Sequence, residues 1–514
     1  MRGTYAGDRD APLAGRAGVG QARAMSEHFD VLIIGAGLSG IGAAYHVQDK
    51  LPGLTYAILE GRERMGGTWD LFRYPGVRSD SDMYTLGYPF RPWMGDEAIT
   101  SGASILAYIE ETAKAYGIDE KIRYETRVRR VSWSSGDALW TVEADTPGGP
   151  VTLTCRYLLS CCGYYDYEGG YTPDFPGAED FGGEIVHPQD WHDGVETEGK
   201  RIVVIGSGAT AVTLVPALTQ TAAHVTMLQR TPTYVASRPA KDELSAIARR
   251  FLPGPLAHGV LRAKNVLMSI YIYQLSRKKP QKLRRYLIDE AQKRLGDEVQ
   301  ADPHFAPPYD PWDQRLCLVP DDDLFEALRG GSASIVTDQI ERFDEAGILL
   351  ESGQHLDADL VVSATGLKLL PFGGIEIVLD GAPLDLASTY NYKGMMFSGV
   401  PNFAACFGYT NASWTLKIDL TARAFCRLIR AAMRRGADSF VPRFDGEPPA
   451  PQPLLDFASG YVQRDIHRFP RQGPQRPWRN HQNYVADALD IGLGRIDDGV
   501  MRFERARKTE ESAA

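Results

Sequence analysis

The sequence lacks several features that are typical of metal-binding, redox-dithiol and nucleic-acid-binding proteins. Its six cysteines include no Cys-x-x-Cys pair, which excludes the usual spacings of zinc knuckles and redox dithiols. It also has no excess of basic residues: 56 Lys and Arg stand against 66 Asp and Glu, a formal charge of -10, which argues against a dedicated nucleic-acid binder. We therefore expect a soluble protein with no metal site and no nucleic-acid partner, and with small molecules as its ligands.

The cysteines indicate the redox setting of the protein. They are Cys155, Cys161, Cys162, Cys317, Cys406 and Cys426. Cysteines without the spacings of zinc knuckles or redox dithiols fit a reduced, cytoplasmic location. The adjacent Cys161 and Cys162 end an apolar run; reactive thiols are one interpretation and plain buried strand residues are the favoured one.

The first 26 residues are rich in Ala, Gly and Arg and contain no continuous apolar stretch. This composition predicts a disordered extension rather than a signal peptide or a membrane span. Met25 leads straight into the first predicted strand, so the sequence leaves open whether Met1 or Met25 is the biological start. The whole chain of 514 residues is long enough for two or three domains.

A first nucleotide site is predicted near the N-terminus. The apolar run 30–34 reads as a buried parallel strand, the turn 35–40 (Gly-Ala-Gly-Leu-Ser-Gly) follows it, and a helix is expected over 41–47. In this pattern Gly35 permits the turn, Gly37 lets the backbone approach a pyrophosphate, and Gly40 allows close helix packing. Ser39 belongs to the same turn, and the N–H groups that start the helix attract phosphate.

An acidic residue completes this first site. The run 56–60 supplies a second strand, and Glu60 ends it 20 residues after Gly40. At that distance a carboxylate accepts hydrogen bonds from the ribose of a bound adenosine. The alternative is a plain glycine turn followed by a solvated Glu.

A second nucleotide site is predicted about 170 residues later. The apolar strand 201–205 leads into Gly206-Ser207-Gly208-Ala209-Thr210-Ala211, where Ala211 is an accepted replacement for the third glycine. A helix follows through residue 218. The next strand, 225–228, is followed by Arg230 and Thr231 instead of an acid. Because Arg230 can pair with a ribose 2'-phosphate, the sequence predicts NADPH rather than NADH.

Two further segments carry a family resemblance. The pattern Gly-Gly-x-Trp, four residues, Tyr-Pro-Gly, three residues, Asp covers 66–80, and Phe181-x-Gly183-x-x-x-His187-x-x-x-Trp191 lies between the two glycine turns. Both are similar to segments of type I Baeyer-Villiger flavin monooxygenases. Longer runs, at 66–76, 311–320 and 408–417, resemble the branch of that family that activates the thioamide prodrug ethionamide.

The resemblance implies FAD at the first site and NADPH at the second. It assigns flavin contacts to one set of residues: Thr68, Trp69, Asp70, Leu71, Asp80 and Val128. It also implies that the segment 181–191 is a linker between the nucleotide domains, with His187 as an orienting residue rather than a proton-transfer group. His192 departs from the family pattern at the end of the linker, and Gln314 stands where many members have Lys, which predicts a milder NADPH preference.

The resemblance names a chemical centre as well. It implies that Arg315 stabilises an anionic flavin peroxide formed from reduced flavin and O2, and that Asp80 holds Arg315 by an ion pair. Without the resemblance, a lone Asp and a lone Arg are more often surface charges. The implied substrates are small apolar ketones, converted to esters or lactones, and sulfur compounds such as sulfides and thioamides.

We therefore expect an α/β enzyme with two doubly wound, Rossmann-like domains and a helical insertion. The expected boundaries are 1–26 for the extension, 27–163 and 367–514 for the FAD domain, 164–238 and 313–366 for the NADPH domain, and 239–312 for the insertion. The insertion is basic and amphipathic, with Pro253, Pro255 and Pro280 as predicted breaks.

The apolar faces of this insertion have two interpretations. Their members include Leu261, Val266, Leu267, Ile270 and Tyr273. Docking onto the body of the protein is favoured, and a weak peripheral membrane contact of a cytoplasmic enzyme is the alternative. The sequence does not determine the oligomeric state.

Four rival functions are weighed against the Baeyer-Villiger monooxygenase. A flavin disulfide reductase shares the two-nucleotide architecture but needs a redox dithiol near the flavin, which the spacing does not supply. An NADPH oxidase would share every residue named. An N- or S-oxygenating flavin monooxygenase without Baeyer-Villiger activity is a further alternative, although Trp191 is the residue by which the resemblance separates the Baeyer-Villiger group from it. A non-enzymatic flavin-binding sensor is disfavoured by the intact Arg315, Asp80 and Trp191.

Overall fold

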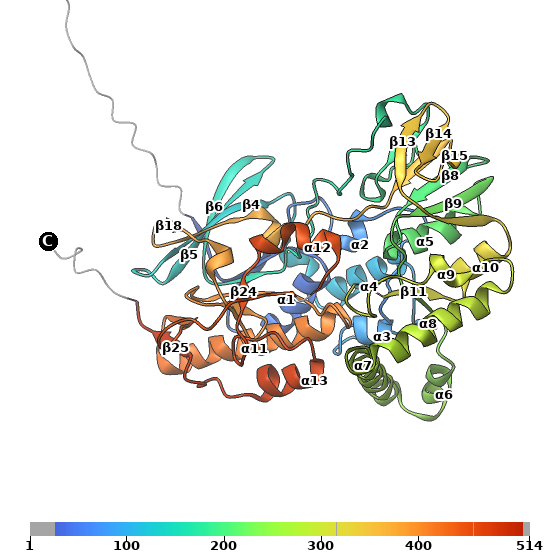
Figure 1. Cartoon of the computed structure of the whole chain (residues 1–514). Coiled ribbons are helices and arrows are strands. Elements are labelled where there is room, and N and C mark those ends of the chain that lie inside the picture. The colour runs from blue at the N-terminus through green and yellow to red at the C-terminus, as the bar shows by residue number, and fades with distance from the viewer. Residues whose placement is uncertain (1–25, 315, 456, 507–514) are drawn as a thin grey trace, which may run out of the picture.

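The structure is a computed structural model that describes residues 26–314, 316–455 and 457–506. These residues form two helix-covered sheets with a group of helices beside them (Figure 1). The predicted N-terminal extension lies outside the described residues, except for residue 26. The fold class, α/β with two separate sheets flanked by helices, agrees with the prediction.

The first sheet has nine strands taken from distant parts of the chain. Its order is β18-β17-β4-β5-β6-β1-β2-β3, and β21 also pairs with β6. The strands are β1 (Glu27–Ile34), β2 (Tyr56–Leu59), β3 (Ile122–Arg123), β4 (Arg127–Ser134), β5 (Leu139–Thr146), β6 (Gly149–Ser160), β17 (Glu376–Leu379), β18 (Ala382–Pro383) and β21 (Phe403–Ala405). β1 runs parallel to β2 and β6, whereas β5 is antiparallel to β4 and β6.

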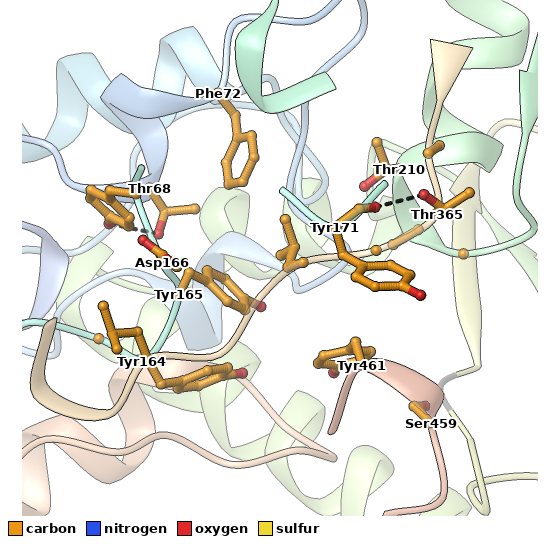
Figure 2. A pocket seen from close by; sticks show the side chains of 18 of the residues that line it. Thr68, Phe72, Tyr164, Tyr165, Asp166, Tyr171, Thr210, Thr365, Ser459 and Tyr461 are labelled. Atoms are coloured by element: carbon orange, nitrogen blue, oxygen red, sulfur yellow. Dashed lines mark hydrogen bonds between the residues drawn. The ribbon is translucent and has the colours of Figure 1, made fainter. Parts of the chain in front are cut away.

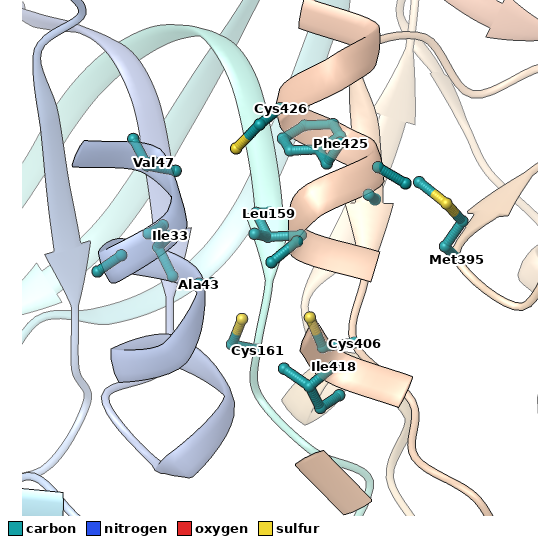
Figure 3. Close-up of a cluster of buried hydrophobic side chains, with 14 of the residues drawn as sticks. Ile33, Ala43, Val47, Leu159, Cys161, Met395, Cys406, Ile418, Phe425 and Cys426 are labelled. Carbon is teal, nitrogen blue, oxygen red and sulfur yellow. The ribbon is translucent and has the colours of Figure 1, made fainter. Parts of the chain in front are cut away.

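Helices from both ends of the chain lie around this sheet, and the first and the longest of them contact its strands. They are α1 (Leu38–Lys50), α2 (Thr68–Leu71), α3 (Met83–Leu86), α4 (Gly102–Ala115), α11 (Trp414–Arg435), α12 (Gly460–Asp465) and α13 (Tyr484–Asp487). Figure 3 shows Ala43 and Val47 of α1 and Phe425 and Cys426 of α11 on either side of Leu159 in β6. The C-terminal helix α11 therefore completes the core that the N-terminal strand begins.

The second sheet is smaller and wholly parallel. Its order is β12-β9-β8-β16-β7. The strands are β7 (Glu184–Val186), β8 (Arg201–Ile205), β9 (His224–Gln229), β12 (Ala333–Thr337) and β16 (Leu360–Ser363), and the helices packed with them are α5 (Ala209–Leu218) and α10 (Asp323–Arg329). β8 is buried along all but its first residue, as an apolar strand between two neighbours should be.

Smaller sheets accompany the two large ones. A three-stranded antiparallel sheet is formed by β13 (Ile340–Asp344), β14 (Gly347–Leu350) and β15 (His355–Asp357). The remaining pairs are β10 (Val235–Arg238) with β11 (Cys317–Pro320), β19 (Asn391–Tyr392) with β20 (Met396–Phe397), β22 (Ser439–Pro442) with β25 (Met501–Glu504), and β23 (Gln452–Pro453) with β24 (Arg471–Gln472).

The predicted helical insertion is present beside the second sheet. It contains α6 (Glu243–Phe251), α7 (Gly254–Lys278), α8 (Pro280–Leu295) and α9 (Ala301–His304). Pro253 caps α7 and Pro280 begins α8, where a missing N–H costs nothing. Leu261 and Val266 are buried as expected, but Leu267 is 60% exposed, so the expected docking is wrong for that residue. In the described part of the chain, no helix combines the length and the apolarity needed to cross a membrane.

Candidate functional site

A cavity of about 1240 Å³ lies between the two sheets. Ile34 and Gly35, where β1 ends, line one part of it, and Ile205 and Gly206, where β8 ends, line another. Ligands of open parallel sheets bind outside the carboxyl ends of the strands, which is where this cavity lies. Its volume exceeds the roughly 300–1,000 Å³ usual for one small-molecule site, so it has room for more than one ligand.

Both glycine turns leave a helix N-terminus open toward the cavity. α1 begins after Gly37 and α5 after Gly208; neither helix has a capping side chain or an acidic residue in its first turn. Gly37 and Gly208 themselves line the cavity. Uncapped N–H groups and the positive end of the helix dipole bind phosphate. The two turns therefore fit two pyrophosphates, one for each predicted dinucleotide.

The first turn is held by close backbone packing. Gly35 has a φ of 101°, and its N–H donates to the carbonyl of Leu59 at 2.8 Å. A Cβ on Gly40 would lie 1.9 Å from the carbonyl oxygen of Gly35, so only glycine fits there. Gly35, Gly37 and Ser39 line the cavity, whereas Gly40 supports the turn from beneath.

Glu60 lies at the carboxyl end of β2 and lines the cavity. It is buried, and its two oxygens accept hydrogen bonds from the N–H groups of Ala36 at 2.7 Å and Arg62 at 3.0 Å. Burial raises the pKa of this carboxyl, while the two N–H donors oppose the rise. A carboxylate has about four lone-pair sites, so acceptor capacity toward a ribose is left.

The segment 66–80 divides its residues between the cavity and the protein interior. Thr68, Trp69 and Asp80 line the cavity, as does Val128 of β4. Asp70 does not: it is buried and pairs with arginine side chains, at 2.8 Å from Arg62 and 2.6 Å from Arg73. Leu71, at the end of α2, is half-buried outside the lining. Asp70 therefore holds the segment in place, and its predicted direct contact with FAD stays a prediction.

The same segment reaches across to the second domain. Tyr74 is buried in the core of that domain, and burial raises its pKa to about 12. Arg78 pairs with Asp323 at 2.5 Å. A Cβ on Gly76 would lie 2.7 Å from the side chain of Ala217 in α5. The loop that the resemblance assigns to the flavin thus also fixes the position of the second nucleotide domain.

The second turn presents its residues in the same way as the first. Ser207, Gly208, Ala209 and Thr210 line the cavity together with Gly206, and Ala211 is buried behind them. The hydroxyl of Ser207 donates to the carbonyl of Thr231 at 2.8 Å, which joins the turn to the end of β9. Thr231 also lines the cavity.

Arg230 lines the cavity from an exposed position. Within the part of the chain that the structure describes, it forms no ion pair, so its charge is available to a ligand. Asp338 follows the neighbouring strand β12 and lines the same cavity. The sequence did not single out Asp338, because the pairing of β12 with β9 is needed to bring it there.

The linker fingerprint lies behind the cavity wall rather than in it. Phe181 packs on Phe343 at 5.9 Å between ring centroids, and Trp191 is half-buried against the core of the second domain. Gly183 lies against the carbonyl of Asp359, where a Cβ would approach within 2.6 Å. None of these three residues contacts the cavity.

His187 joins the two chain segments that cross between the domains. Its Nδ1 accepts the N–H of Gln189 at 3.1 Å, so Nε2 carries the proton and donates to the carbonyl of Gly366 at 3.0 Å. Burial lowers the pKa of His187, which keeps the ring neutral. Gly366 belongs to the turn through which the chain returns to the first domain.

Of the two predicted catalytic residues, the structure describes one. Arg315 lies outside the described residues, while its neighbours Gln314 and Cys317 line the cavity. Asp80 is half-buried and lines the same cavity. The ion pair between Asp80 and Arg315 stays a prediction.

Sequence reasoning missed the aromatic residues of the crossing segments. Residues 164–171 leave the first domain and 366–370 return to it, and they pair side by side: Asp166 N–H donates to Lys368 at 2.9 Å and Leu370 N–H to Tyr164 at 2.9 Å. Figure 2 shows Tyr164, Tyr165 and Tyr171 around the cavity. The cluster of tyrosines directly after β6 was the available signal.

A third segment closes the cavity from the C-terminal part of the chain. Ser459, just before α12, and Tyr461 within it line the cavity (Figure 2), and Arg464 of the same helix does so too. The guanidinium of Arg464 lies 3.6 Å from the ring centroid of Tyr171. Phe457 and Trp414 add apolar surface. These residues are far from the glycine turns in sequence, and only the fold brings them together.

Three thiols line the cavity, those of Cys161, Cys162 and Cys317, and the surroundings of Cys161 make it a poor nucleophile. Cys161 lines the cavity and faces Cys406, which follows the adjacent strand β21 (Figure 3). Burial raises the pKa of Cys161 well above its usual range, and the neighbouring thiol of Cys406 raises it further. Because the thiolate is the reactive form, this arrangement disfavours the disulfide-reductase alternative.

Comparison with known proteins identifies the family. Residues 29–378 match the family described as flavin-binding monooxygenase-like, which is more than half of the chain. The chain belongs to this family. The family match covers both glycine turns and the linker between them.

Curated relatives agree over nearly the whole length. The chain is 50% identical to FAD-containing monooxygenase EthA of Mycobacterium tuberculosis (strain ATCC 25618 / H37Rv), over 94% of this chain and 99% of that protein. It is 45% identical to the probable FAD-binding monooxygenase AlmA of Acinetobacter baylyi, over 95% of this chain and 98% of that protein. The predicted enzyme class, a flavin-dependent monooxygenase, is confirmed.

Solved structures share the fold. An oxidized steroid monooxygenase bound to NADP superposes with a TM-score of 0.71 at 23% identity, covering 93% of this chain and all of that one. A cyclohexanone monooxygenase bound to ε-caprolactone gives 0.71 at 19% identity with the same coverage. At these identities the likeness concerns the fold. Together with the relatives, this likeness confirms the predicted α/β fold of a flavin-binding monooxygenase.

Proposed function

We propose that this FAD- and NADPH-dependent monooxygenase inserts one oxygen atom of O2 into apolar ketones and also oxygenates sulfur compounds such as sulfides and thioamides. The observation that carries the proposal is the single cavity that joins the carboxyl ends of both nucleotide-binding sheets. One cavity with two phosphate-binding helix ends places a hydride donor and its acceptor within reach of each other.

We propose the predicted division of the chain into domains. Residues 27–163 and 367–514 would form the FAD domain, since strands from both ranges build the nine-stranded sheet. Residues 164–238 and 313–366 would form the NADPH domain, because all five strands of the parallel sheet lie within them. The insertion would occupy 239–312.

Each cofactor has its own set of holding residues in this proposal. The N-terminus of α1 binds the FAD pyrophosphate and Glu60 its ribose, and the N-terminus of α5 binds the NADPH pyrophosphate. Arg230 binds the 2'-phosphate by charge-assisted hydrogen bonds. When bound, FAD accepts two electrons from NADPH and activates O2. His187 acts as an orienting residue, since its hydrogen bond to Gly366 ties the linker to the returning chain.

The aromatic wall supports an apolar substrate. Tyr164, Tyr165, Phe457, Tyr461 and Trp414 line the cavity and come from three separate segments. Such surfaces exclude water, which strengthens every electrostatic interaction inside. In this proposal Asp80 orients Arg315, whose permanent charge stabilises negative charge that develops on the reacting oxygen.

Product analysis of the purified enzyme tests this function. The enzyme is supplied with FAD, NADPH and either a cyclic ketone or a methyl aryl sulfide, and NADPH use, organic product and hydrogen peroxide are measured together. We expect lactone and sulfoxide in amounts close to the NADPH consumed. Peroxide alone would indicate the NADPH oxidase, and sulfoxide without lactone would indicate the S-oxygenating alternative.

Replacement of Arg230 by alanine should weaken the binding of NADPH more than the binding of NADH. A hydrogen bond to a charged group is worth about 1.5–3 kcal/mol, so its loss should raise the KM for NADPH roughly ten- to hundred-fold. The KM for NADH, which lacks the 2'-phosphate, should change little. Steady-state kinetics with both nucleotides measures the difference. Arg342→Ala is the matched control, because Arg342 is an exposed arginine of the same domain in β13, outside the cavity. An equal loss for NADPH and NADH would remove Arg230 from this role.

A weak peripheral membrane contact was the remaining prediction for the partners of this enzyme. The helical insertion, residues 239–312, is the segment that would make this contact.

A further inference from the structure

The long helix α7 turns an apolar face to solvent. Its exposed large side chains are Leu256, Val260, Leu267, Met268 and Tyr271, with exposed fractions from 46 to 63%. Residues 256, 260, 267 and 271 are spaced by four and seven positions, so they lie along one face of the helix. A continuous apolar stripe of this length differs from the single exposed apolar residues that are normal on protein surfaces.

No charged side chain interrupts this stripe. Between Gly254 and Ser276 the only residues with a permanent charge are Arg262 and Lys264. Arg262 is directed inward and donates to the carbonyls of Tyr84 and Gly87, and Lys264 pairs with Asp242. Both cations therefore contact other groups of the protein.

The preceding helix α6 enlarges the same apolar surface. Leu244, Ile247 and Phe251 are exposed, Phe251 by 75%. α6 and α7 are in contact, and Figure 1 shows them together at the lower edge of the molecule, away from both large sheets. Eight large apolar side chains are thus exposed on two adjacent helices.

Basic residues flank this surface. Lys278 follows Tyr271 by seven positions, so it continues the stripe, and Lys279, Lys282 and Arg285 follow it, all exposed. Residues 243–295 contain 12 Lys and Arg against 3 Asp and Glu, a net charge of +9 in a chain of -10, so the remainder carries -19. The positive charge is concentrated on the part of the protein that exposes the apolar stripe.

We infer that α6 and α7 dock on the surface of an anionic lipid bilayer. The stripe enters the boundary between headgroups and acyl chains, and the cations after Tyr271 pair with lipid phosphates. A second copy of the chain is a poorer occupant, because two copies of the same positively charged surface repel each other. A nucleic acid would use the charge but leave the apolar stripe in water.

The inner face of α7 connects this surface with the cavity. Val266 packs with Tyr409 and Leu416, and Tyr409 lines the cavity. Docking therefore places the cavity wall one helix away from the lipid. Delivery of apolar substrates from the bilayer rests on the proposed function, whereas docking itself does not.

Vesicle sedimentation of the full-length, FAD-loaded enzyme tests the inference. Binding is measured to vesicles of phosphatidylcholine alone and of phosphatidylcholine mixed with phosphatidylglycerol. We expect binding to the anionic vesicles that weakens with salt, a fall of about ten-fold or more in Leu267→Asp, and a fall of about ten-fold in the double variant Lys278→Gln/Lys279→Gln. Val151→Asp is the control, because Val151 is an exposed apolar residue on β6, outside the insertion, and this variant should bind as the wild type does.

The outcomes separate the possible occupants. Absence of wild-type binding to anionic vesicles, or equal binding by Leu267→Asp, overturns the inference. A concentration-dependent dimer that Leu267→Asp abolishes, without vesicle binding, assigns the face to a second copy. Equal FAD content and melting temperature in all variants exclude misfolding, and because binding requires no turnover, its failure is distinct from failure of the proposed catalysis.

Discussion

Replacing Gly40 by alanine is expected to give a protein that purifies without its yellow coenzyme. The new Cβ would lie 1.9 Å from the carbonyl oxygen of Gly35, so the turn that approaches the FAD pyrophosphate must move. Displacement of packed backbone costs up to about 3 kcal/mol, or on the order of a hundred-fold in FAD affinity. The flavin absorbance of the purified protein, relative to its protein absorbance, measures the loss.

Gly53→Ala is the matched control for that substitution. Gly53 lies in the same domain, is exposed, and a Cβ there meets nothing within 4 Å. This variant should retain its flavin and its melting temperature. If Gly40→Ala binds FAD as tightly as Gly53→Ala does, the first glycine turn is not the FAD site.

Replacing Arg315 by alanine should separate NADPH oxidation from oxygenation. Loss of one charge-stabilising donor in an active site costs about a hundred- to a thousand-fold in rate, so lactone and sulfoxide formation should fall by at least that lower figure. NADPH should still be consumed, with the electrons released as hydrogen peroxide, because the holding residues of both nucleotides are untouched. Product and peroxide are measured together in one steady-state assay.

Arg315→Lys controls for charge in this experiment. Lysine retains the positive charge but lacks the planar fork of donors, so partial recovery of product is expected. The product formed per NADPH by Asp80→Asn should lie between the values of the wild type and Arg315→Ala if Asp80 acts only by orienting Arg315. Unchanged coupling of NADPH use to product in Arg315→Ala would exclude the assigned role.

The local parts of both nucleotide sites were predictable from sequence. The strand expected at 201–205 is β8 with the same bounds, and the helix expected over 41–47 is the centre of α1. A buried strand, a glycine turn and a helix follow one another in the chain, so their pattern needs no tertiary information. Glu60 was placed correctly at the strand end, although its two backbone donors, Ala36 and Arg62, could not be foreseen.

The cavity wall was not predictable, because its parts meet only in the folded chain. Tyr164 and Tyr171 come from the outgoing crossing, and Tyr461 comes from a segment almost 300 residues later. Their pairing depends on hydrogen bonds between crossing segments rather than on any local period. The ion pairs of Asp70 with Arg62 and Arg73 were likewise not foreseen, while its contact with FAD stays a prediction.

The insertion shows where periodicity stops being informative. Its apolar spacing correctly indicated helices and the burial of Leu261 and Val266. The same helix carries a second apolar stripe that includes Leu267, and a sequence cannot tell which of two apolar faces meets the protein. Only the packed structure shows that one face is covered and that the other is open.

Oxygen-isotope analysis tests the central claim most directly. The purified enzyme is given FAD, NADPH and a cyclic ketone under 18O2, and the product is analysed by mass spectrometry. The account predicts a lactone that contains one 18O atom per molecule, formed only when NADPH is present. NADPH consumption that yields labelled hydrogen peroxide and no labelled lactone would contradict it.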